Sequence, residues 1–193
     1  MTDILPRGKS NPPNYPPVPG RKIVRLFGLV LFVLSFSAAS HQEKPRLDAT
    51  VELHALSGSG VQGKLHMQQH DTQVVITGEV KGLTPGRHGI HVHTNGDCDS
   101  PGGHYNPTGV RHGGPVDPHA HIGDLGNIEA DPSGRAIVQL SSERISLTIF
   151  GMNSVIDRSI VIHANEDDLK SDPDGNSGVN VACGFIEQDM VRM

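Results

Sequence analysis

The pattern of apolar and polar positions from residue 48 onward has a period of two. Apolar residues occupy every second position of 49–55, and polar residues stand between them. Such alternation is typical of a strand with one buried face. Similar strand-like stretches follow, with Gly- or Pro-containing turns such as 58–60, 83–86 and 131–134 between several of them: 61–69, 72–80, 88–94, 126–130, 135–140, 145–150, 158–163 and 180–186. Eight or nine short strands without a strong helix signal predict an all-β sandwich or barrel.

Residues 95–123 interrupt this pattern. They are rich in Gly, Pro and Asp and have neither period two nor a helical period. Loops without secondary structure that exceed about 12–15 residues are usually functional or disordered. We therefore search this stretch for candidate catalytic and metal-ligating residues.

The first forty residues have a different character. Residues 1–22 are polar and Pro-rich, and Arg21, Lys22 and Arg25 flank an apolar run that ends in small residues at 37–40. This arrangement is typical of a secretory signal with cleavage near residue 39 or 40. A single-pass membrane anchor through residues 23–39 is the alternative, although 17 residues fall short of the ~20 needed to span a bilayer comfortably. We therefore divide the chain into a polar segment (1–22), a signal or anchor (23–40) and one extracytosolic domain (41–193).

Composition narrows the function classes. Gly (23) and Pro (14) make up about a fifth of the 193 residues, which excludes a helical bundle or coiled coil. The net charge is −5 and no basic run is long enough to form a phosphate-binding stripe, so nucleic acid is not an expected partner. Residues 1–39 carry five basic residues and one acidic residue; the remaining chain has 11 basic and 20 acidic residues, a net charge of −9.

Seven potential metal ligands gather around the 95–123 loop. His91 and His93 stand two apart on a predicted strand, so both side chains point to one face. The others lie within the loop, directly after it or at the end of a later predicted strand: His104, His112, His121, Asp124 and His163. Imidazole suits both copper and zinc, a nitrogen-only tetragonal set favours Cu(II), and three His with one carboxylate form a closed tetrahedral zinc site.

Several segments closely resemble the signature segments of the copper/zinc superoxide dismutases. They match in order and internal spacing, and the resemblance runs from about residue 48 to 187: 89–93, 103–107, 111–115, 121–127 and 182–184. The resemblance implies an eight-stranded Greek-key β-barrel, flattened like an immunoglobulin sandwich, with a long metal-binding loop. It also implies one copper and one zinc ion per chain and superoxide as the substrate.

Residue roles follow from the same resemblance. It implies copper ligands His91, His93, His104 and His163, and zinc ligands His104, His112, His121 and Asp124, with His104 bridging both ions as an imidazolate. Asp167 matches the carboxylate that links a copper ligand to a zinc ligand. Cys98 and Cys183 match the family's intramolecular disulfide, which export would favour. The implied activity converts superoxide into dioxygen and hydrogen peroxide, with copper as the redox metal and zinc in a structural role.

The chain departs from the family pattern at three places. Asn180 stands where the family has an anion-guiding Arg, so the candidate catalytic residues are His104 and Asn180. The electrostatic loop before Asn180 is shortened, and Lys170 is its one basic residue. The segment between His93 and Cys98, which often contributes to the family's dimer interface, is also shorter, so a homodimer and a monomer both remain open. We expect a dismutase slower than is typical.

Two other functions compete with this expectation. Asn180 and the short loop would also suit a non-catalytic copper- and zinc-binding protein on the same scaffold. A zinc hydrolase would need an open zinc position and a general base, whereas the three-His, one-Asp set is closed.

Overall fold

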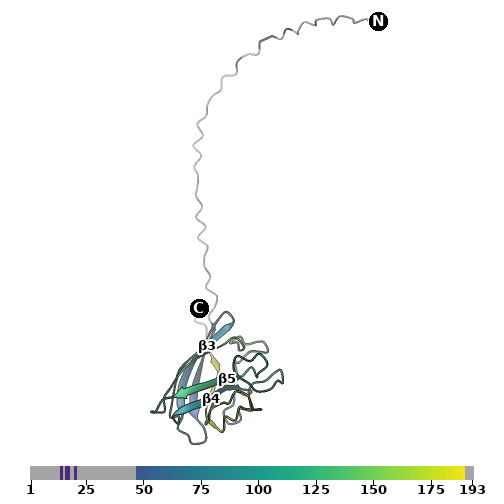
Figure 1. The fold of residues 1–193 in the computed structure, drawn as a ribbon. Coiled ribbons are helices and arrows are strands. Elements are labelled where there is room, and N and C mark those ends of the chain that lie inside the picture. The colour runs from purple at the N-terminus through teal and green to yellow at the C-terminus, as the bar shows by residue number, and fades with distance from the viewer. Residues whose placement is uncertain (1–13, 15, 18–19, 21–46, 190–193) are drawn as a thin grey trace, which may run out of the picture. The chain divides into compact units, whose positions relative to one another are not determined.

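The computed structural model describes residues 14, 16–17, 20 and 47–189 (Figure 1). The predictions for the polar segment, the signal and the anchor therefore lie almost wholly outside the described residues. Among the residues that are described, no helix is long and apolar enough to cross a membrane.

Within 47–189 the regular structure consists entirely of strands. Eight of them have five to nine residues and one has two: β1 (Leu47–Ala55), β2 (Gln62–His70), β3 (Gln73–Lys81), β4 (Gly86–His93), β5 (Asp124–Ala130), β6 (Ala136–Ser142), β7 (Ser159–His163), β8 (Asn180–Phe185) and β9 (Glu187–Gln188). The predicted all-β class is confirmed. Each of these strands except the short β9 coincides with a stretch that the period-two pattern marked.

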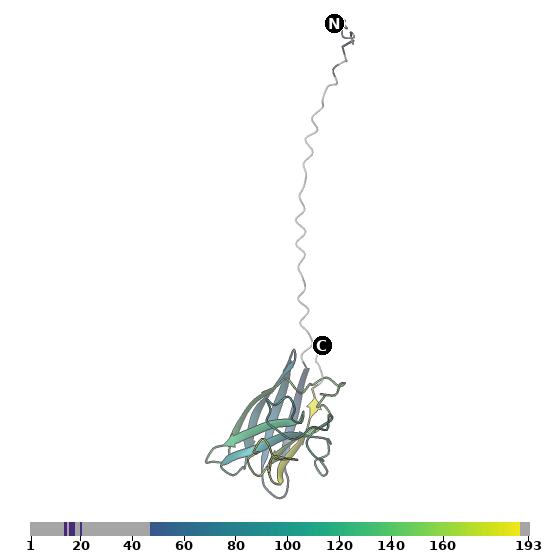
Figure 2. The same cartoon turned by 45° about the vertical axis from the view of Figure 1, so that its right-hand side comes forward.

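The strands form one antiparallel sheet that curls into a nearly closed barrel (Figures 1 and 2). Neighbours follow the order β5-β4-β7-β8-β1-β2-β3-β6, and β9 pairs with β1. The chain passes from β3 in one half of this order to β4 in the other, and returns to the first half through the β5–β6 turn. This crossing between halves agrees with the expected Greek-key barrel.

The core lies inside the barrel because alternate strand residues point inward. In β1 the inward residues Ala49, Val51 and Leu53 are at most 2% exposed, while Glu52 and His54, which alternate with them, are exposed. Facing strands supply equally buried side chains such as Leu65 and Ile76. The resulting close-packed interior gives the loops a rigid frame.

The predicted strand at 145–150 is wrong. Ile145 and Leu147 are buried as the alternation implies, yet this segment forms only one isolated bridge, between Ser146 and Ser154. The backbone N–H of Leu147 donates to Gln69 Oε1 at 2.7 Å, and that of Thr148 to Ser146 Oγ at 3.1 Å. Side chains thus satisfy these donors, so alternating burial occurs here without a ladder.

Three long connections carry most of the remaining backbone. They link β4 to β5 (residues 94–123), β6 to β7 (residues 143–158) and β7 to β8 (residues 164–179). The expected disulfide joins Cys98 in the first connection to Cys183 in β8, across 85 positions. Because Cys183 is fully buried in the barrel wall, the bond anchors the start of the β4–β5 loop to the frame.

Candidate metal centre

Two groups of buried side chains offer ligand atoms to a metal ion. In each group the ligand atoms lie within 4.8 Å of one another. We name them the four-histidine group, made of His91, His93, His104 and His163, and the three-histidine group, made of His104, His112, His121 and Asp124. His104 belongs to both groups, so the two metal positions are adjacent. These are the same two sets that the sequence motifs suggested.

The barrel wall positions the four-histidine group. His91 and His93 are two residues apart on β4, where they pair with Val161 and Ser159 of β7. His163 ends β7, and His104 forms an isolated bridge with His93. Three of the four rings therefore come from adjacent strands, and the long loop adds the fourth.

Two rings of this group present facing nitrogen atoms. The Nδ1 atoms of His93 and His163 donate to the carbonyl oxygens of Gly102 (2.8 Å) and Gly178 (3.2 Å). A neutral ring that donates from Nδ1 carries a lone pair on Nε2. The two Nε2 atoms lie 3.3 Å apart. Two acceptors at this distance repel each other unless a cation lies near both, which fits a metal-binding position.

Other buried ring nitrogens also lack hydrogen-bond partners. They are Nδ1 of His91, Nε2 of His104 and Nδ1 of both His112 and His121. The last two form no hydrogen bond but approach the Asp124 carboxylate, with His112 Nδ1 3.1 Å from Oδ2 and His121 Nδ1 3.3 Å from Oδ1. A buried polar atom without a partner is costly, and such atoms are rare in native structures. Since all four belong to the two groups, the residues present fit a pair of metal ions.

Asp124 organises the three-histidine group. Its Oδ1 lies 2.8 Å from His104 Nδ1, and its Oδ2 accepts the backbone N–H groups of Gly113 and His121, each at 3.1 Å. One of these backbone donors directly follows His112 and the other belongs to His121, so Asp124 holds both ends of the loop segment 113–121. The carboxylate thus draws the loop around itself and brings the three rings together.

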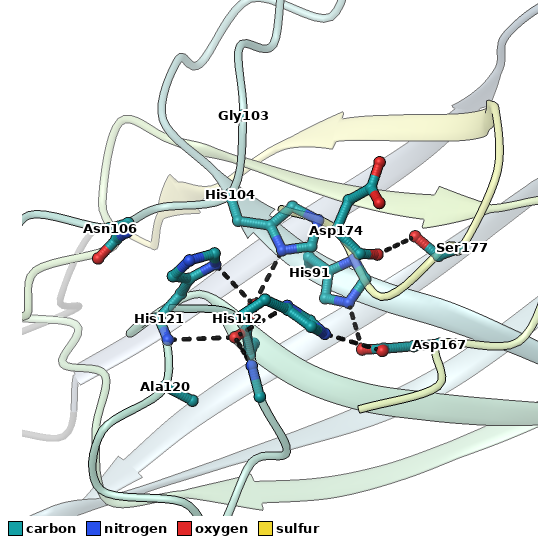
Figure 3. A network of polar contacts seen from close by, with 12 residues as sticks. His91, Gly103, His104, Asn106, His112, Ala120, His121, Asp167, Asp174 and Ser177 are labelled. Atoms are coloured by element: carbon teal, nitrogen blue, oxygen red, sulfur yellow. Dashed lines mark hydrogen bonds and ion pairs between the residues drawn. The ribbon is translucent and has the colours of Figure 1, made fainter. Parts of the chain in front are cut away.

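Asp167 connects the two groups from outside. Its Oδ2 accepts from His91 Nε2 at 2.8 Å, and its Oδ1 accepts from His112 Nε2 at 2.9 Å. The dashed lines at Asp167 in Figure 3 mark both contacts. Each bond fixes a ring orientation and directs the other ring nitrogen toward a metal position.

Burial sets the protonation of the four-histidine group. Burial is the main cause that lowers the pKa of His91 and His93 to about 3 and that of His163 to about 4. These rings are therefore neutral at pH 7, as metal ligation requires.

At the two carboxylates and at His112, contacts with neighbouring groups outweigh the effect of burial on the pKa. Burial alone would raise the pKa of Asp124 and Asp167, but hydrogen bonds from the histidines outweigh it and hold both values well below the usual range. Burial likewise opposes protonation of His112, yet its contacts with the two carboxylates raise its pKa to about 10. A metal that binds His112 must therefore displace a proton.

Sequence reasoning did not assign three residues that support this centre. Asn127 clamps Asp167 by donating from Nδ2 to its carbonyl (2.9 Å) and accepting its N–H at Oδ1 (2.8 Å). His88 is buried, and its Nδ1 lies 2.8 Å from the carbonyl oxygen of His163. Gly175 has φ +67°, and a Cβ there would lie 1.9 Å from Asp167 Oδ1. Asn127 stands inside a recognised motif, whereas nothing local in the sequence marks the other two.

A pocket of about 640 Å³ opens onto the four-histidine group. His93, His104 and His163 line it, and Asn180 lies beside them because it pairs with His163 between β7 and β8. The charged lining residues are Arg111, Asp172 and Asp174. A small solute can therefore approach the four-histidine group past groups of both signs.

Comparisons with known proteins agree with this centre. Residues 61–186 match the family described as copper/zinc superoxide dismutase (SODC). The chain is 44% identical over 151 residues to an extracellular superoxide dismutase (Cu-Zn) of Brugia pahangi, with 72% of this chain and 74% of that protein covered. It is 43% identical to superoxide dismutase (Cu-Zn) 5 of Dictyostelium discoideum (68% and 93% covered) and 44% identical to a superoxide dismutase (Cu-Zn) of Onchocerca volvulus (72% and 96% covered).

Proposed function

Because this chain belongs to the copper/zinc superoxide dismutase family, we propose that its four-histidine group holds copper and its three-histidine group holds zinc. The observation that carries the assignment is the difference between the donor sets. A nitrogen-only set suits Cu(II), and three imidazoles with one carboxylate suit a closed zinc site. The chain is a superoxide dismutase, and these two groups are its proposed active centre.

Bound copper supplies one-electron redox chemistry, by which two superoxide anions and two protons become one dioxygen and one hydrogen peroxide. The protein contributes the shape and charge of the place where this occurs. The pocket admits a small anion to the side of the four-histidine group that faces solvent. Because the histidine rings of this group are neutral, they do not cancel the positive charge of a bound copper ion. That charge favours an anion in the pocket.

His104 is the proposed proton donor. Its Nδ1 is held 2.8 Å from Asp124 Oδ1, its Nε2 is buried without a hydrogen-bond partner, and the residue lines the pocket. A proton taken up at Nε2 would lie next to the peroxide that forms in the pocket, and it could pass to that peroxide. Asp167 contributes by holding His91, whose ring stacks on His104 with centroids 3.8 Å apart.

Asn180 is the reason we propose a slow member of the family. Its amide can donate a hydrogen bond to an anion in the pocket but supplies no positive charge. Asp172 and Asp174 line the same pocket and repel an anion. Superoxide therefore meets weaker local attraction than an Arg at position 180 would provide.

Export is the proposed destination. The relative from Brugia pahangi is named as extracellular, and the sequence before residue 40 has the features of a secretory signal. Retention through residues 23–39 and a homodimer remain alternatives to a released monomer.

Two variants test the metal assignment. We expect His163→Ala in the full chain to lose copper and superoxide turnover but keep zinc, and His121→Ala to lose zinc first. Elemental analysis after dialysis measures both metals, and loss of superoxide measures turnover. Loss of zinc rather than copper in His163→Ala would contradict the assignment. Full copper occupancy without turnover in the unaltered chain would favour the non-catalytic metal-binding alternative.

A further inference from the structure

The pocket mouth contains one cationic side chain, and it lies outside the electrostatic loop. Arg111 precedes the ligand His112 in the β4–β5 loop and lines the pocket together with His93, His104 and His163. Among the described residues that line this pocket, Arg111 is the only Lys or Arg. Any charge attraction that the lining side chains offer to an anion therefore comes from this residue.

The Arg111 guanidinium is free to bind a ligand. Its side chain is 70% exposed, and Nη2 lies 3.9 Å from Asp117 Oδ2. The other arginines of the 47–189 region all use their guanidinium groups within the protein: Arg87 on Glu166, Arg135 on Glu79, Arg144 on Ala120, and Arg158 on Ser154 and Thr94. Arg111 alone among them forms no hydrogen bond, which leaves its five N–H donors unused.

The fold holds Arg111 at this mouth. Asp172 Oδ1 accepts the backbone N–H of His112, so the shortened β7–β8 loop is tied directly to the residue after Arg111. On the other side of Arg111, the Val110 N–H donates to Asn106 Oδ1 at 3.1 Å, and Asn106 Nδ2 donates to the Val110 carbonyl at 2.7 Å. The backbone at 110–112 is therefore fixed while the Arg111 side chain stays free.

We propose that Arg111 attracts and docks the anionic substrate, and so supplies from the β4–β5 loop the charge that Asn180 lacks. This inference rests on the proposed function, since it concerns the substrate of the same pocket. The guanidinium presents a planar fork of donors that suits a small oxyanion. The Asp117 carboxylate competes with the substrate for this guanidinium. The half-buried Asp174 carboxylate also lines the pocket and repels an anionic substrate.

Azide binding tests Arg111 without relying on turnover. Azide is a small anion that ligates Cu(II) and changes its absorption spectrum, so a titration of the copper- and zinc-loaded full chain gives a dissociation constant. We expect Arg111→Gln to weaken azide binding about threefold to fivefold at low salt, in the range of one exposed charge contact. The difference should shrink at high salt because screening removes it.

Two further variants make the test specific. Arg135→Gln removes the same charge from a residue that pairs with Glu79 outside the pocket, and it should leave azide affinity unchanged. Asp117→Asn frees the Arg111 fork and should strengthen azide binding. Equal azide affinity in Arg111→Gln and the unaltered chain, or an equal loss in Arg135→Gln, would overturn the proposal.

Failure of this inference is distinguishable from failure of the proposed function. If Arg111→Gln binds azide normally while the unaltered chain consumes superoxide, only the role of Arg111 is wrong. If the loaded chain consumes no superoxide, the proposed function fails, while the azide titration still reports whether Arg111 docks anions.

Discussion

At the scale of single residues, the histidines of the centre divide their two nitrogens between two tasks. His93 and His163 each donate from Nδ1 to a backbone carbonyl, and His91 and His112 each donate from Nε2 to Asp167. In every case the second nitrogen faces one of the two ligand groups. The bonds behind the rings thus set the orientation of each ring.

Asp167 should therefore support both metals at once. We expect Asp167→Asn to weaken copper and zinc binding by about 10- to 100-fold, because an amide cannot accept from His91 and His112 together. Competition with chelators of known affinity measures both constants. Asp168→Asn is the matched control, since the Asp168 carboxylate bonds Ser171 and Asn176 and touches no ligand ring. A change at one metal only would show that Asp167 does not couple the groups.

For Asn180 we predict a substitution that raises activity. A unit charge about 4 Å from an anion contributes about 1 kcal/mol in water, so Asn180→Arg should raise kcat/KM for superoxide about fivefold at low salt. Val179→Arg controls for the added charge, because Val179 is exposed and is not among the residues that line the pocket. If Asn180→Arg is no faster than Val179→Arg, position 180 does not limit the rate.

At the scale of elements, strands were more predictable than loops. Period two located strands that bury one face, such as β1 and β6, whereas β7 and most of β4 are buried on both faces and were marked by their apolar content. The alternation failed at 145–150, where Gln69 and Ser146 side chains replace a partner strand. The ligand residues were predictable because their motifs are local and specific. The approach of Gly175 to His112 and the bond of His88 to His163 were not, since these partners are far away in the sequence.

Gly175 tests whether the β7–β8 loop shapes the centre. A Cβ there would lie 1.9 Å from Asp167 Oδ1 and 2.7 Å from His112 Nε2. We expect Gly175→Ala to separate these two groups and to speed zinc loss to a chelator. Gly58→Ala serves as the control, because Gly58 has a similar φ (+70°) but no atom within 4 Å of the added Cβ. Equal zinc loss in the two variants would attribute the effect to backbone strain alone.

The disulfide should stabilise the same frame from the other loop. In the chain-entropy model, a bond across 85 positions contributes about 4–5 kcal/mol. We expect the double variant Cys98→Ala, Cys183→Ala to lose a free energy of unfolding of that order, measured by urea denaturation of the metal-free protein. It should also be cut faster by proteases within residues 94–104. Unchanged unfolding and cleavage would mean that the loop is held by its hydrogen bonds instead.

At the scale of the whole molecule, a rigid barrel carries a reactive centre in an acidic chain. The protein has a net charge of −5, or −9 without residues 1–39, so its overall field does not attract superoxide. Attraction must then be local, at the pocket that Arg111, Asp172 and Asp174 line. We therefore attribute the chemistry of this protein to its family centre and its rate to the few charges at the pocket mouth.

The most direct test of the account is the decay of superoxide followed in the presence of the full chain. We predict that chain loaded with one copper and one zinc consumes many superoxide anions per copper and yields one hydrogen peroxide for every two. Chain loaded with zinc alone should leave the decay unchanged. A correctly loaded two-metal protein that removes superoxide no faster than buffer would contradict the account.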